Sequence, residues 1–278
     1  MRMHKSIAYI LTLLLAVLTL AFAIWGPERI ARYQDERTLN RVTVEEAGES
    51  SEGYRYSLSS NEKLYILAKC LNSQSLPESE QSSRTRVESQ ELGYEELTGS
   101  YAFIMNRQGP TGEEITEEEI FNTCNRQLEE LKELGILPQE VKEVTDISYD
   151  AVLYSAIDVL EPRNNLAVWK VSLSTNQQNA DKSNRLLDAY VDADTGRIYE
   201  FYVRIGKSWS ELDPEEIIAQ WSTYLGLSGM EEYESDNPLL ETTPHFKKFR
   251  FPGTEVESTV VTIGFYEGIN ELYIKISK

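Results

Sequence analysis

Apolar residues recur with the helical period in three segments of this chain, and each segment has a recognisable start. The first helix is predicted from Ser59 to Leu71, because Ser59 and Glu62 form a capping box. A second capping box, Thr116 with Glu119, opens the next helix. Its apolar stripe consists of Ile120, Cys124, Leu128 and Leu131.

The third helix is predicted to begin after Asp213, with Pro214 at its first position. Its apolar side consists of Ile217, Ile218, Trp221 and Leu225. The second and third helices share a C-terminal stop, in which Gly takes a left-handed conformation and an apolar residue follows. This stop is Leu134-Gly135-Ile136 in one helix and Leu225-Gly226-Leu227 in the other.

Runs rich in β-branched and aromatic residues predict strands after each of these two helices. The first group comprises 151–160, 166–174, 186–192 and 197–205, the second comprises 246–251, 258–265 and 271–276, and a further short strand is expected at 54–58. Turn-like residues separate the runs, which favours antiparallel meanders, and a helix on one face of a meander buries one apolar layer. The predicted fold class is therefore α+β, with two helix-plus-antiparallel-meander modules.

The longest apolar run, Ile7–Trp25, carries no charge. As a helix it would extend roughly 28 Å, close to the hydrocarbon thickness of a bilayer. Arg2 and Lys5 precede it, as in export signals. We expect a transmembrane signal anchor in the cell membrane, with the N-terminus inside and the bulk of the chain extracytoplasmic. Cleavage after Ala23, in an Ala-x-Ala site, is the alternative.

The predicted organisation has six parts, of which the stalk and the linker rest on polar, Gly- and Ser-rich composition. They are a cytoplasmic tip (1–6), the transmembrane signal anchor (7–25), a stalk (26–53), a strand–helix segment with a polar linker (54–96), the first module (97–206) and the second module (207–278).

Three parts of the first module resemble the PepSY domain: its helix, the strand Val168–Leu173 and the hairpin Asp188–Phe201, which carries an Asp-x-x-Thr-Gly turn. The resemblance covers about 117–204 and, more loosely, 213–278. PepSY-like domains occur in propeptides of secreted peptidases and in membrane-anchored extracytoplasmic proteins of bacteria. The resemblance implies a binding, inhibitory or regulatory module rather than an enzyme.

Charge narrows the choice of partner. The chain has 46 acidic and 27 basic residues, a net charge of −19. Such a field repels nucleic acid and anionic lipid headgroups. We expect no nucleic-acid partner; the partner is another membrane or exported protein, such as a sensor or a peptidase. A solvated, soluble ectodomain explains the acidity most simply, and a basic partner or calcium-rich surroundings is the more specific alternative.

No catalytic, cofactor-binding or metal-binding residue can be nominated. Asp192-Ala193-Asp194-Thr195-Gly196 begins like a calcium loop, but its Gly comes one position early and Val203 stands where the bidentate Glu is needed. A hairpin turn explains the same letters. Gly226-Leu227-Ser228-Gly229 misses the spacing of a nucleophile elbow, and Gly206-Lys207-Ser208 lacks the upstream glycine of a phosphate loop.

Three residue types leave alternatives open. Cys70 and Cys124 are either buried hydrophobes or one disulfide bridge. His245 is predicted to be a surface or turn residue, and His4 lies in the tip. Strand packing is the default for Tyr190, Tyr199 and Tyr202, although an exposed tyrosine-rich sheet face could bind a peptide or a glycan.

These observations favour a membrane-anchored, extracytoplasmic, non-catalytic protein- or peptide-binding module with a regulatory or inhibitory role. A structural scaffold of the envelope or spore and an exported carboxylate-dependent hydrolase are the alternatives.

Overall fold

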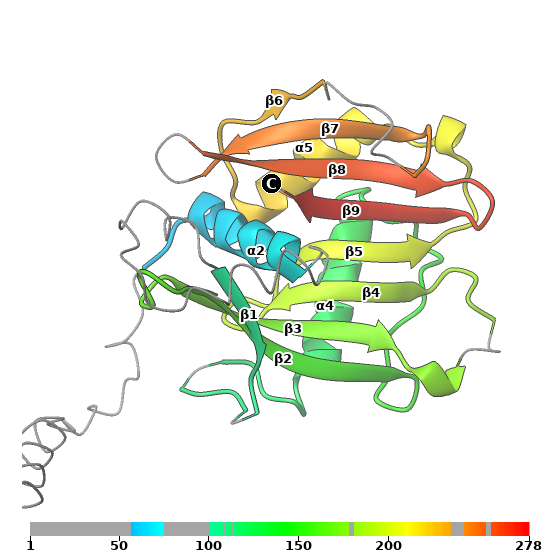
Figure 1. The fold of residues 1–278 in the computed structure, drawn as a ribbon. Helices are drawn as coiled ribbons and strands as arrows, with labels where there is room; N and C mark the ends of the chain where they lie inside the picture. Colours follow the sequence, from blue (N-terminus) through cyan, green and yellow to red (C-terminus); the bar gives the residue numbers. More distant parts are fainter. Residues whose placement is uncertain are drawn as a thin grey trace, which may run out of the picture. The chain divides into compact units, whose positions relative to one another are not determined.

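The folded body is built on a single antiparallel sheet. The computed structural model describes residues 57–74, 101–107, 109–112, 114–177, 181–234, 242–253 and 257–277. Within these ranges, nine strands pair in the order β1-β2-β3-β4-β5-β9-β8-β7-β6 (Figure 1). The strands are β1 (Tyr101–Met105), β2 (Tyr149–Asp158), β3 (Asn165–Leu173), β4 (Leu186–Asp192), β5 (Ile198–Arg204), β6 (Glu231–Glu232), β7 (Phe246–Pro252), β8 (Ser258–Tyr266) and β9 (Glu271–Ser277).

Helices lie on both faces of this sheet. The α-helices are α2 (Ser60–Gln74), α4 (Ile120–Glu133) and α5 (Pro214–Leu225), and short 3-10 turns occupy Thr175–Gln177 and Trp209–Glu211. Figure 1 shows α2 in front of the sheet and α4 and α5 behind it. The sheet is therefore the middle layer, and apolar side chains from all three helices join one buried core with it.

The helix starts and stops agree with the sequence patterns. Ser59 Oγ donates to Glu62 Oε2 at 2.7 Å, which completes the capping box before α2. Asp213 accepts a bond from the Glu216 amide at the start of α5, and Gly226 ends that helix with φ of 71°. Only half of the predicted capping box of Thr116 and Glu119 forms: Glu119 Oε2 accepts from the Thr116 amide and hydroxyl, but the Glu119 amide donates to the Thr116 carbonyl, and the regular helix begins at Ile120.

The predicted fold class of two helix-plus-meander modules after a transmembrane helix is wrong. The seven predicted strands between 149 and 277 are present, but β5 pairs with β9 and joins both meanders into one sheet. This seam pairs Phe201–Arg204 with Glu271–Ile274. The apolar faces of the two predicted modules thus belong to one continuous core.

The predicted anchor, stalk, 54–58 strand and most of the polar linker cannot be compared with this fold. Residues 7–25, 26–53 and 75–96 lie outside the described residues, as do the first three residues of that strand. Within the described ranges, no helix has both the length and the apolar character needed to cross a membrane.

Candidate functional site

The candidate site is a set of six aromatic side chains on one face of the sheet. We call it the aromatic band; its members are Phe103, Tyr154, Tyr190, Tyr202, Tyr273 and Tyr266. They come from five strands, β1, β2, β4, β5 and β9, together with the end of β8. The band therefore crosses the sheet and includes both sides of the β5–β9 seam.

Ring contacts hold the band together in two groups. Phe103 stacks on Tyr154 with 4.6 Å between ring centres and meets Tyr190 edge-on at 5.9 Å. On the other side of β5, the Tyr273 ring lies between those of Tyr202 and Tyr266, at 5.6 and 5.0 Å. Offset and edge-on geometries at these distances are favourable for aromatic rings.

Strand alternation places the band on the face that carries α2. Tyr190 and Asp192 are two residues apart on β4 and therefore share a face. Lys63 of α2 contacts Asp192, which identifies this face as the α2 side. The helix α2 packs on β1, β2, β3, β8 and β9 and reaches the end of β4 through Lys63 and Asp192. In Figure 1 it lies across one end of the central strands, and no described helix lies in front of the other end of β4 and β5.

Most of the band is only partly buried. Phe103, Tyr154, Tyr190, Tyr202 and Tyr266 keep part of their surface exposed, whereas Tyr273 is buried. The Tyr273 ring lies over Gly264 of β8, where a Cβ atom would overlap it. Glycine at this position lets the ring lie flat on the sheet, and Tyr266 and Tyr202 stack on either side of it.

A charged row runs beside the rings. Register aligns Lys170 with Tyr190 and Tyr190 with Glu200, and extension of the β5–β9 register aligns Glu200 with Lys275. The Lys170 ammonium lies 5.8 Å from the centre of the Tyr190 ring. Neither lysine forms an ion pair with any residue that the structure describes.

Glu200 is a buried carboxyl at the centre of this row. Its Oε2 accepts a hydrogen bond of 2.9 Å from the Ile276 amide, just beyond the last paired residues of the seam. Burial raises the pKa of Glu200 to about 7, although the Ile276 amide, the Lys275 ammonium and the Tyr202 hydroxyl favour its ionised form. The nearby Asp188 carboxylate acts in the same direction as burial.

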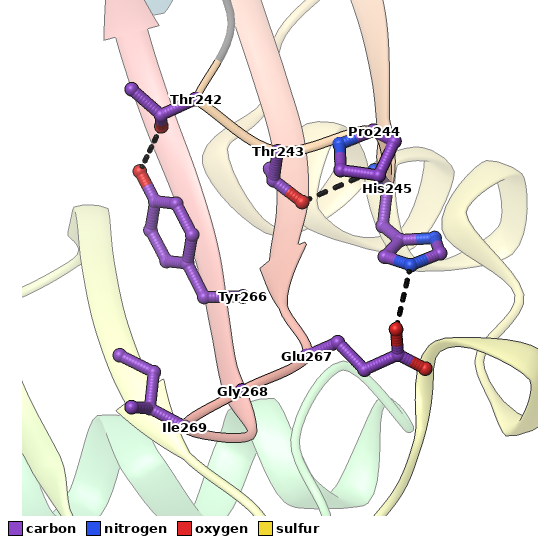
Figure 2. Close-up of a pocket in the computed structure, with 8 residues that line it drawn as sticks. All are labelled: Thr242, Thr243, Pro244, His245, Tyr266, Glu267, Gly268 and Ile269. Atoms are coloured by element: carbon purple, nitrogen blue, oxygen red, sulfur yellow. Dashed lines mark hydrogen bonds and ion pairs between the residues drawn. The ribbon is translucent and has the colours of Figure 1, made fainter.

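A hollow of about 400 Å³ lies where the band ends, at the β8–β9 turn (Figure 2). It is lined by Thr242, Thr243, Pro244, His245, Tyr266, Glu267, Gly268 and Ile269. In Figure 2, His245 Nε2 lies 3.1 Å from Glu267 Oε2, and the hydroxyls of Tyr266 and Thr242 are 2.8 Å apart.

The hydroxyls of this hollow are already engaged. Thr243 Oγ1 donates to the Phe265 carbonyl and accepts from the His245 amide, while Thr242 Oγ1 bonds to Tyr266. A His–Glu pair can move a proton, but nucleophilic catalysis also needs a nucleophile within reach of the base. Among the residues lining the hollow, both threonine hydroxyls make other contacts.

The Asp192–Gly196 motif forms a turn whose first carboxylate holds helix α2 against the sheet. Asp192 Oδ1 accepts from the amides of Asp194 and Thr195, and Oδ2 accepts from Tyr199 and Lys63. Protein donors thus engage both carboxylate oxygens that calcium would need. Gly196 has φ of 78°, as a turn glycine does. Among the described residues, no group of three or more His, Cys, Asp and Glu could hold a metal ion.

The two cysteines are not bridged. Cys70 on α2 and Cys124 on α4 are both buried thiols outside any disulfide, and Figure 1 places their helices on opposite faces of the sheet. Burial raises the pKa of each thiol to about 12. The two cysteines are therefore buried hydrophobic residues, and the predicted alternative of one disulfide bridge is wrong.

The sequence pattern pointed to Tyr190, Tyr199 and Tyr202, and these three tyrosines have different surroundings in the structure. Tyr190 and Tyr202 belong to the band, whereas the Tyr199 hydroxyl is buried against Asp192. Phe103, Lys170, Glu200 and Lys275 were missed, because single residues of these types occur on many solvent-facing strands.

No protein-family model, no curated protein and no solved structure matches this chain. The likeness to the PepSY domain therefore stays a prediction from the residues of 117–204.

Proposed function

We propose that this chain is a non-catalytic module that binds another protein through the aromatic band. The observation that carries the proposal is the row of partly exposed tyrosines on a face of the sheet that the described helix α2 covers only at one end. Tyr is among the residues that dominate binding energy in protein interfaces, because its ring offers a large contact area at a low cost in side-chain entropy. The hollow beside Tyr266 extends the same surface.

The sequence supports a location at the outer face of a membrane. Ile7–Trp25 is uncharged and follows basic residues, so the chain is proposed to be held there with its bulk extracytoplasmic.

Photo-crosslinking in the producing cells tests the proposal. A benzophenone amino acid replaces Tyr154 or Tyr202 in the full chain, which keeps an aromatic ring at each position. The control carries the same group in place of Glu133, an exposed residue at the end of α4 behind the sheet.

We expect one discrete crosslinked protein from both band positions and none from position 133. A Tyr190→Ser change should reduce its yield at position 202, because it removes a neighbouring ring without touching the crosslinker. The absence of a product, or an equal product from position 133, would overturn the proposal.

A further inference from the structure

The two lysines in the charged row suggest what the partner presents to the band. In a chain with 46 acidic and 27 basic residues, a cation has carboxylates available almost everywhere. Like Lys207 and Arg126, Lys170 and Lys275 have no ion-pair partner among the described residues. Both lie on the band face, since Lys170 is opposite Tyr190 and Lys275 is two residues from Tyr273.

We propose that the aromatic band binds an extended acidic segment of the partner protein, with carboxylates at Lys170 and Lys275. This inference rests on the proposed function and adds the partner's chemistry to it. Opposite charges placed across an interface fix register and discriminate against wrong partners. The aromatic rings supply the contact area between the two charged positions.

Sheet geometry sets the spacing of the two acidic groups. Lys170 is on β3 and Lys275 on β9, three strand steps apart in the order β3-β4-β5-β9. Neighbouring strands are about 4.8 Å apart, so the two positions are separated by roughly 14 Å. An extended chain advances about 3.3 Å per residue, so carboxylates four residues apart span this distance. The segment thus crosses the strands and passes over Tyr190, Glu200 and Tyr202.

Glu200 lies between the two lysines and adds selectivity. Tyr190 and Asp188 face it from β4, Tyr202 from β5 and Lys275 from β9. A third carboxylate placed midway along the segment would meet Glu200 and Asp188 and be repelled. A neutral or aromatic residue there would instead contact the two tyrosine rings. The partner motif is therefore acidic at its ends and uncharged in its middle.

Peptide binding tests this inference independently of the natural partner. The probe is a fluorescent nine-residue peptide with two glutamates four residues apart and tyrosine and serine between them. Matched peptides carry glutamine or lysine instead of the glutamates, and a fourth has the two glutamates adjacent. Binding to the full chain in detergent is followed by fluorescence anisotropy at 50 and 300 mM NaCl.

The spaced-glutamate peptide should bind at least about tenfold more tightly than each of the other three. Its affinity should fall about tenfold in the double variant Lys170→Gln/Lys275→Gln and should also fall at the higher salt concentration. Arg126→Gln is the matched control; it removes the same charge from an exposed position on α4, behind the sheet, and should change the affinity less than about twofold.

Equal binding of the glutamine peptide, no binding of the spaced-glutamate peptide, or no effect of the double variant would overturn the inference. If crosslinking at Tyr154 and Tyr202 still captures one protein in that case, the proposed function stands and only the acidic chemistry is wrong. If crosslinking also fails, both are wrong.

Discussion

The Lys63 ammonium lies 3.1 Å from Asp192 Oδ2, which joins α2 to the β4–β5 turn across 129 positions of sequence. Only 1% of the Asp192 side chain is exposed, and the Tyr199 hydroxyl donates to the same oxygen at 2.7 Å. A motif that begins like a calcium loop therefore serves to fix a helix on the band face of the sheet.

Replacement of Asp192 by Ala should destabilise the fold by about 3–5 kcal/mol, because it leaves a partly buried ammonium and a buried hydroxyl without their acceptor. Urea unfolding of the full chain measures this change. Asp194→Ala is the control; Asp194 also contacts Lys63, but 39% of its side chain is exposed, so a cost of about 0–1 kcal/mol is expected. Equal losses of unfolding free energy in the two variants would contradict this structural role of Asp192. Added calcium should leave the unfolding midpoint unchanged.

Stability should fall as pH rises from about 4.5 to 7, because of Glu200. Its pKa is about 7 in the folded chain and its ordinary value is 4.5, so the folded state holds this proton more tightly than the unfolded state does. Protonation of Glu200 therefore adds about 3 kcal/mol to the unfolding free energy below pH 4.5, and this contribution is lost as the pH rises through 7.

Glu200→Gln should remove this loss, so the difference in unfolding free energy between variant and parent should change by about 3 kcal/mol between pH 4.5 and 8. Glu62→Gln is the contrasting variant. Hydrogen bonds from Ser59 lower the pKa of Glu62, so its stabilisation is lost as pH falls below 4.5. If the unfolding free energies of the parent and of Glu200→Gln changed in parallel with pH, the pKa of Glu200 would not be raised in the folded chain.

Gly264→Ala should disturb the aromatic band. The new methyl group would overlap the Tyr273 ring, which is packed between Tyr202 and Tyr266. We expect a loss of about 1–3 kcal/mol in unfolding free energy and a lower crosslinking yield at position 202. Gly268→Ala changes the next turn, where a Cβ meets nothing within 4 Å, and should cost less than about 0.5 kcal/mol. A larger cost at Gly268 than at Gly264 would argue against this packing.

Both thiols should be inert in the folded chain. Cys70 and Cys124 are buried, and the pKa of about 12 leaves almost no thiolate at neutral pH. Iodoacetamide at pH 7.5 should label neither residue until guanidinium unfolds the chain, after which mass spectrometry should find two additions. Rapid labelling of either cysteine in the native chain would contradict its burial.

Local structure could be predicted from the sequence, because its causes are local. The Ser59–Glu62 capping box, the Asp213 cap and the Gly226 stop each act within four residues, and all three are present. Strand positions followed from runs of β-formers, and β4 matches its predicted bounds. The edge strands β1 and β6 were missed; β6 is only two residues long and fully exposed.

Tertiary pairing could not be predicted in the same way. The β5–β9 seam joins residues about 70 positions apart, and the alternating pattern of each strand is the same whichever neighbour it has. The faces of the tyrosines depended on a register shift: Tyr190 pairs with Glu200 and Val191 with Ile198, so Tyr199 is an extra residue that reaches Asp192. The net charge of −19 is a property of the whole chain and does not show that Lys170 and Lys275 share the band face, because three neighbouring strand pairings bring them onto it.

The position of β9 has a consequence for the order of events during synthesis. Residues Glu271–Ser277 leave the ribosome after β5 and β8, yet they lie between these two strands in the interior of the sheet. Until they arrive, β5 has an unpaired edge that can pair with another chain. A nascent chain therefore needs protection of this edge during synthesis, and loss of these seven residues would divide the sheet between β5 and β8.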